Sequence, residues 1–267
     1  MKSVPLLLSA VACVAAVGCK NAKKKNSDKE MAETGVTAVV PNITIEKLEG
    51  SPAYPKATLQ LNKPTHAHVP AGIVAFDFAV THYDLGAQTA HAGENRLANS
   101  GKGQHIHFIV DDGPYAAHYE PKFDVAMDEG THYIVAFLAR SYHESVKNAH
   151  SFVAKKIVVG DASKGESMHV DLAQPTLIYS RPKGTYKGAD TKNLLLDFFL
   201  LNTELSPSGN KVRATINGRE FVIADWAPYI IKGLPKGRVT VKLELLDADG
   251  HVMPGDFNSV LRKVELK

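Results

Sequence analysis

Two segments of this 267-residue chain repeat one another. VAFDFAVTHYDL at 74–85 aligns with LLLDFFLLNTEL at 194–205 at an offset of 120, so that Asp77 meets Asp197. Three further matches follow the same order in both halves: LNKP at 61–64 with YSRP at 179–182, GQHIHFIVDDGPY at 103–115 with GNKVRATINGREF at 209–221, and DEGTHYIVAFL at 128–138 with LPKGRVTVKLELL at 234–246. A repeat of this length indicates two copies of one folding unit, which limits the architectures open to the chain.

Both copies consist of short runs rich in β-branched and aromatic residues, such as GIVAFDFAV and HIHFIV, separated by turn residues. Runs of this length and spacing are typical of all-β sandwiches, and no long helical period is present. We therefore predict an all-β chain with two tandem immunoglobulin-like sandwiches, at 40–161 and 167–267, joined by the polar segment DASKGES.

The first copy has a longer loop than the second. The alignment offset falls from 120 to 106 between the matched strands, so the first copy carries fourteen extra residues around AQTAHAGENRLANSGKG. Long loops on a rigid sandwich are common places for binding sites.

The amino-terminal residues are typical of an exported protein. An apolar run from Val4 to Val17 follows Lys2, as in a secretory signal peptide, and it is too short to span a bilayer. AAVGC, ending at Cys19, resembles the bacterial lipobox. The resemblance implies that residues 1–18 are removed as a signal peptide and that lipid on Cys19 anchors the protein to a membrane. Lys20 after the cysteine implies delivery to the outer membrane of the bacterial cell envelope; the alternative is an ordinary signal peptide in which Cys19 is incidental.

The segment after the predicted signal peptide has the composition of a spacer. The number of cysteines excludes chemistry based on a thiol. We expect residues 19–39 to form a flexible linker after the lipidated cysteine, because KNAKKKNSDKEMAETG is polar, rich in lysine and without an apolar period. The formal net charge of +3 is concentrated in the lysines of this tail, so the folded part carries little net positive charge. We therefore predict that the folded part does not bind nucleic acid. Cys13 and Cys19 are the only cysteines, so the mature chain has no thiol for a disulfide or a nucleophile.

Histidines gather in the first copy. Ten of the twelve lie between His66 and His150. The aligned second copy has other residues at four of these positions: Asn202 for His82, Lys211 for His105, Arg213 for His107 and Val239 for His132. Since the second copy is expected to fold without these imidazoles, we infer that the fold does not require them.

Strand alternation predicts that two of these histidines lie side by side. In HIHFIV, successive side chains point to opposite faces, so His105 and His107 share one face while Ile106, Phe108 and Val110 share the other. Two imidazoles at this spacing stand about 7 Å apart at the backbone, close enough to bind one metal ion.

A third ligand has to come from another segment. ARSYHES at 139–145 follows a predicted strand and offers His143, with Glu144 as a further candidate and Arg140 and Tyr142 as neighbours that orient the ligands or bind an anion. Loops provide other possible ligands, His66, His68, His82 and His91, and His132 in the strand THYIVAFLA is a further candidate. Imidazoles with a carboxylate suit Zn²⁺ or Cu²⁺, whereas a blue copper site is excluded because its thiolate is missing.

HIHFIVDD, followed by DEGTHYIVAFLARSYHES, resembles small secreted bacterial Ig-like domains rich in histidine. These include a family of uncharacterised function found in outer-membrane and periplasmic proteins. The resemblance implies a fold but no activity. It covers part of the first copy only, and the second copy lacks all of its histidines.

These observations lead to one prediction and two alternatives. We predict a lipoprotein whose first domain binds a divalent transition metal on its surface through His105, His107 and His143. The first alternative is a non-catalytic module for adhesion or assembly in the cell envelope, which binds a protein or glycan through loops near 66–91. Ser141 to Glu144 do not encode a catalytic triad, because adjacent strand residues point to opposite faces. We therefore predict no enzyme activity, with metal-assisted hydrolysis as the second alternative.

Overall fold

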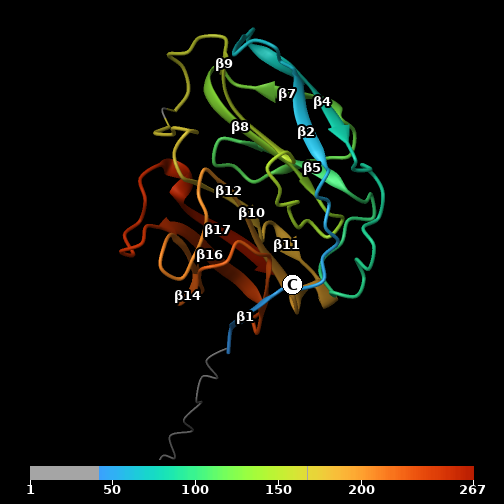
Figure 1. Ribbon diagram of the computed structural model, residues 1–267, viewed down its shortest axis with the longest axis vertical. Coiled ribbons are helices and arrows are strands. Elements are labelled where there is room, and N and C mark those ends of the chain that lie inside the picture. Colours follow the sequence, from blue (N-terminus) through green and yellow to red (C-terminus); the bar gives the residue numbers. More distant parts are fainter. Residues whose placement is uncertain (1–41, 167) are drawn as a thin grey trace, which may run out of the picture. The chain divides into compact units, whose positions relative to one another are not determined.

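The computed structural model describes residues 42–166 and 168–267 (Figure 1). The predicted signal peptide at 1–18, the lipidated Cys19 and the linker to residue 39 lie outside the described residues and stay predictions. The described residues belong to one compact unit. None of them forms a helix that is long and apolar enough to cross a membrane.

The first copy consists of two β-sheets around an apolar core. The smaller sheet has the order β2 (Thr58–Lys63), β4 (Gly72–Thr81), β7 (Lys122–Met127). The larger has the order β3 (His68–Val69), β9 (Phe152–Val159), β8 (Gly130–Ala139), β5 (His105–Val110), β6 (Ala116–His118). Phe76, Phe108 and Ile134 are buried between the two sheets.

The second copy repeats this arrangement. Its smaller sheet has the order β1 (Thr44–Lys47), β15 (Tyr229–Lys232), β12 (Leu194–Leu201), β10 (Thr176–Arg181). Its larger sheet has the order β11 (Thr185–Tyr186), β17 (Ser259–Leu266), β16 (Gly237–Leu246), β13 (Lys211–Ile216), β14 (Arg219–Ile223). Two short 3₁₀ helices, η1 (Gly188–Thr191) and η2 (Asp256–Asn258), lie in its loops.

The equivalent strand orders confirm the all-β class and the duplication. An irregularity in strand register also recurs in the two copies. The register of β2 with β4 shifts between Leu61 and Lys63, and the register of β10 with β12 shifts between Tyr179 and Arg181.

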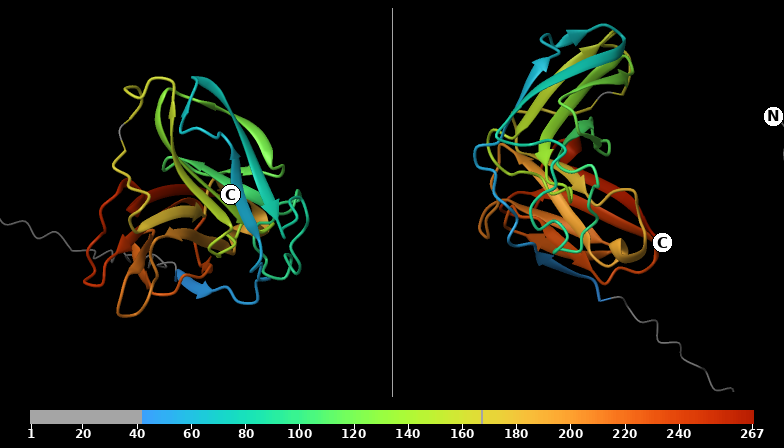
Figure 2. Two further views of the ribbon diagram at one scale, coloured as in Figure 1. Left: turned by 45° about the horizontal axis from the view of Figure 1, so that its top comes forward. Right: turned by 90° about the vertical axis from the view of Figure 1, so that its right-hand side faces the viewer.

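The first strand departs from the predicted boundary. β1 falls within the range assigned to the first sandwich, yet it pairs antiparallel with β15, with Ile45 opposite Ile231. Figure 2 shows the blue β1 beside the orange strands of the second copy. Without β1, β15 would be the edge strand of its sheet and would have unpaired backbone groups. Alternation within a strand does not reveal which sheet it joins.

The predicted alternation on β5 is confirmed. Ile106, Phe108 and Val110 pack in the core of the first copy. Ile109, on the same face as His105 and His107, packs instead in a cluster that includes Phe199 and Leu201 of β12.

The prediction that the site lies on the surface is wrong. His105 and His107 are fully buried, because the second copy covers their face of β5. The shared cluster also contains Phe137 of β8, whose ring stacks on Phe199 of β12 with a centroid separation of 5.0 Å. All of β12 and most of β8 are buried on both faces, and their near-continuous apolar runs are typical of such strands.

Candidate metal centre

Three histidines converge from two separate segments. His105 and His107 lie on β5, which is hydrogen-bonded to β6 on one side and to β8 on the other. His143 lies in the turn after β8, where its backbone amide donates to the carbonyl of Arg140 at 2.8 Å. Its φ of +73° is in the left-handed region, which allows the chain to turn back toward β5.

The three imidazoles come within reach of one ion. His105 Nε2 lies 3.0 Å from His107 Nε2 and 3.1 Å from His143 Nδ1. One nitrogen from each ring lies within 4.8 Å of the other two. Zinc–nitrogen bonds of about 2.0–2.1 Å in a tetrahedron place the ligand nitrogens about 3.4 Å apart, so small movements accommodate a metal ion.

Neighbouring groups orient two of the rings. His105 Nδ1 lies 2.9 Å from the carbonyl oxygen of Gly103, which only accepts hydrogen bonds, so Nδ1 carries the hydrogen and Nε2 presents a lone pair to the other two rings. His107 Nδ1 lies 3.2 Å from Ser180 Oγ. Such outer contacts set the tautomer and the orientation of metal-binding histidines.

The close turn before His105 requires a glycine. Gly103 has a φ of +86°, and a Cβ on it would lie 2.2 Å from the carbonyl oxygen of Gly86. A larger residue would therefore displace the carbonyl that orients His105.

Burial keeps the three rings neutral. Desolvation lowers the pKa of His105 from 6.5 to about 4, and it lowers the pKa of His107 and of His143 well below the usual range. The positive charges of Arg181 and Lys183 lower all three pKa values further. Neutral imidazole is the form that binds a metal ion, so the rings need not lose a proton at neutral pH.

The other residues predicted near His143 point elsewhere. Glu144 is buried and pairs with the Arg140 guanidinium, with Oε1 and Nη1 3.0 Å apart. Arg140 also donates to the carbonyl of Pro52, and the Tyr142 hydroxyl donates to Ser51 Oγ at 3.0 Å. These three side chains fasten the segment before β2 to the turn after β8 and do not complete the metal centre.

The other candidate histidines are not brought to the cluster either. His66, His68 and His82 are exposed, and His68 Nε2 lies 2.8 Å from the carbonyl oxygen of Gly160. His132 Nδ1 lies 2.8 Å from Asp111 Oδ2, where it ties β8 to the turn after β5.

Sequence reasoning missed one aromatic neighbour of the cluster. Tyr115 precedes β6, and its ring stacks on His107 with centroids 3.4 Å apart and planes 10° apart. Its hydroxyl oxygen lies 3.2 Å from His143 Nδ1. The sequence signal was its place in DDGPY, directly after the strand that carries the two histidines.

Residues of the second copy complete the surroundings and were also missed. Lys183 donates to the carbonyl of Tyr115, and its Nζ lies 3.9 Å from the centroid of the Tyr115 ring. The Arg181 guanidinium carbon lies 5.3 Å from the same centroid. With Ser180, these groups come from the end of β10 and the turn after it, so packing of the two copies decides their presence.

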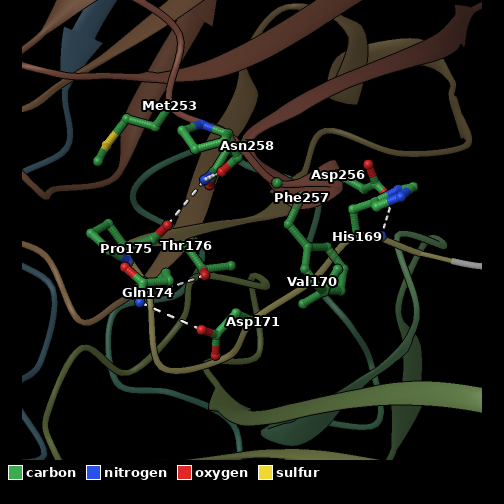
Figure 3. A pocket seen from close by; sticks show the side chains of 12 residues that line it. His169, Val170, Asp171, Gln174, Pro175, Thr176, Met253, Asp256, Phe257 and Asn258 are labelled. Carbon is green, nitrogen blue, oxygen red and sulfur yellow. Dashed lines mark hydrogen bonds and ion pairs between the residues drawn. The ribbon is translucent and has the colours of Figure 1, made fainter.

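A separate pocket of about 400 Å³ lies in the second copy, between the segments 169–176 and 253–258 (Figure 3). Asn258 at its wall donates to the carbonyls of Pro175 and Pro254 and accepts from the amide of Leu177. Its amide is therefore used by the fold, and none of the predicted site residues lines this pocket.

Comparisons with known proteins find distant similarity in structure only. No protein-family model matches the chain, and no curated protein matches it. Fibronectin(III)-like modules of Clostridium thermocellum CbhA are 11% identical, with 79% of this chain and 94% of theirs covered and a TM-score of 0.28. Bacteroides ovatus SGBP-B, from a mixed-linkage glucan utilization locus and in complex with a mixed-linkage heptasaccharide, is 13% identical, with 82% and 47% covered and a TM-score of 0.22. The BSP domain of a biofilm associated protein is 15% identical, with 79% and 29% covered and a TM-score of 0.20.

Proposed function

We propose that the chain binds one divalent transition-metal ion, Zn²⁺ or Cu²⁺, through His105, His107 and His143. The observation that carries the proposal is the approach of three neutral imidazole nitrogens, with separations of 3.0 and 3.1 Å around His105 Nε2. Because His105 Nε2 carries no hydrogen, its lone pair is available to bind a cation shared with the two neighbouring nitrogens. Three nitrogen ligands without sulfur suit Zn²⁺ and Cu²⁺.

Calorimetric titration of the purified protein with each metal tests the proposal. We expect one ion per chain and a Kd below about 10 μM, which corresponds to about 7 kcal/mol. The His105→Ala/His107→Ala variant should lose this binding because it removes two of the three ligands. The matched control is His66→Ala/His68→Ala, which removes an exposed pair at the same spacing and should bind as the parent does.

Two results would contradict the proposal: no binding of either metal, or equal binding by the His105→Ala/His107→Ala variant and the parent. The alternative, recognition of an envelope protein or glycan through loops near 66–91, would then be favoured.

We further propose that lipid on Cys19 holds this metal-binding unit at the bacterial cell envelope, in the outer membrane. Replacing Cys19 by alanine should move the protein from the membrane fraction to the soluble fraction, because acylation is the proposed anchor. Immunoblots of fractionated cells measure this distribution, and an unchanged membrane fraction would contradict the anchor. Replacing Cys13, which lies within the predicted signal peptide, by alanine is the control and should change nothing.

A further inference from the structure

The second copy has its own version of the sheet face that carries the histidines in the first copy. β13 is equivalent to β5, and β16 is equivalent to β8. In the first copy this outer face packs against the second copy through apolar residues such as Ile109 and Phe137. The equivalent positions in the second copy hold Thr215 and Glu244, which are polar. This face of the second copy is therefore not suited to packing against another sandwich.

Cations predominate on this face, which we call the basic face. Its outward side chains alternate with core residues along β13, β14, β16 and β17, and the charged ones are five cations, Lys211, Arg213, Arg238, Lys242 and Lys263, and three acids, Glu220, Glu244 and Glu265. Glu244 is buried between two of the cations, 2.9 Å from Arg213 Nε and 2.6 Å from Lys242 Nζ. Lys236 directly before β16 and Lys267 directly after β17 are exposed and add positive charge at one end of the face.

Two exposed apolar side chains lie on the basic face. Val222 on β14 is 62% exposed and Leu261 on β17 is 50% exposed. In the strand ladders Val222 lies opposite Arg213, and Leu261 lies opposite Lys242. Apolar side chains among cations are typical of surfaces that bind anionic membranes, because the cations attract the lipid phosphates and the apolar groups enter the headgroup region.

The chain enters the folded unit beside the sheet that carries the basic face. Asn42, the first described residue, accepts a hydrogen bond through Oδ1 from Arg219 Nη1 at 3.1 Å. Arg219 begins β14, which is the edge strand of this sheet. A lipid anchor on Cys19 is therefore joined to the second copy, at an edge of the sheet with the basic face.

We propose that the basic face docks on an anionic phospholipid surface, that of the membrane which holds the lipid anchor. This inference rests on the proposed anchor at Cys19 and is independent of the metal centre. The face adds to the anchor and does not replace it, because binding through a few charges and two apolar side chains is reversible and weakened by salt. The Cys19→Ala protein should therefore still leave the membrane fraction when membranes are washed with salt.

Sedimentation of the full-length Cys19→Ala protein with lipid vesicles tests the proposal without the anchor. We expect binding to vesicles of equal parts phosphatidylglycerol and phosphatidylcholine, and little binding to phosphatidylcholine alone. Leu261→Ser/Lys263→Glu, added to this protein, should weaken binding about tenfold or more, because it removes an apolar group and reverses a charge at the membrane surface. The lysine-rich segment before the folded unit is the same in every variant, so differences between variants report on the face.

The first copy offers a matched control. Ile73→Ser/Lys122→Glu makes the same chemical changes on the outer face of β4 and β7, where Ile73 is 73% exposed and the Lys122 side chain is 74% exposed. This variant should bind the anionic vesicles as the Cys19→Ala protein does. A second pair on the basic face, Val222→Ser/Arg238→Glu, should weaken binding as the first pair does, and it decides the matter should the first pair not fold.

Three results would overturn the docking face: equal binding by the Cys19→Ala protein and both variants of the face, an equal loss in the control, or displacement from the vesicles by duplex DNA at the same phosphate concentration. The last result would identify a general site for polyanions. The proposed anchor fails separately, when the Cys19→Ala protein stays with salt-washed membranes, and the metal titration is unaffected by either failure.

Discussion

Replacing Asp197 by alanine is expected to lower the free energy of unfolding by about 3–5 kcal/mol, the usual cost of leaving one partner of a buried ion pair alone. Asp197, on β12 of the second copy, is fully buried. It accepts hydrogen bonds from Ser145 N and Oγ, both at 3.1 Å, and pairs with the Lys147 ammonium. The variant leaves a lysine whose side chain is only 13% exposed without its counter-ion.

The duplication provides a matched control for this variant. Asp77 occupies the equivalent position on β4 and pairs with Lys122 at 3.1 Å, but the Lys122 side chain is 74% exposed. Water therefore replaces the lost partner in Asp77→Ala, and we expect a loss of no more than about 1 kcal/mol. Urea unfolding of the metal-free proteins measures both values, and similar losses in the two variants would contradict the prediction.

The Asp197→Ala variant also tests how the metal centre is held in place. Ser145 and Lys147 follow His143 closely in the chain, so Asp197 fastens the turn that carries the third ligand to the second copy. We expect weaker metal binding in Asp197→Ala and unchanged binding in Asp77→Ala, measured by the titration described above.

The metal-free protein is expected to lose stability as the pH falls below 6.5. Burial lowers the pKa of His105 from 6.5 to about 4, so between these values the unfolded chain binds a proton that the folded chain does not. Stability then falls with falling pH, by about 2 kcal/mol between pH 6.5 and 5 from His105 alone. His107 and His143 act in the same direction, because burial lowers their pKa values too. Well above pH 6.5 all three are neutral in both states and contribute no pH dependence.

Urea unfolding with a chelator present, at pH 7, 6 and 5, measures this effect. The range stays above the ordinary pKa values of Asp and Glu, so the buried histidines dominate it. His105→Gln should reduce the dependence by the contribution of one ring, because His107 and His143 remain. His66→Ala/His68→Ala, which removes exposed rings, should keep the full dependence. Equal stability of the parent at pH 7 and pH 5 would show that the three rings are not buried as neutral groups.

Local patterns along the chain were sufficient for much of this description. The repeated segments identified two copies of one β unit, because turns and strand lengths are set by short-range backbone preferences. Period-two alternation separated His105 and His107 from Ile106 and Phe108, because a strand points successive side chains to opposite faces. The choice of His143 as the third ligand followed from its place just after a strand.

Long-range packing settled the rest. Alternation shows that two residues share a face but not what covers it, and here the second copy buries that face and brings Ser180, Arg181 and Lys183 to the site. The directions in which the side chains of a turn point also depend on contacts distant in the chain. The backbone at His143 is left-handed and its ring lies toward β5, whereas the Glu144 carboxylate pairs with Arg140. The sequence did not reveal Tyr115 as a neighbour of the cluster for the same reason, since its contact with His143 joins segments that no local preference brings together.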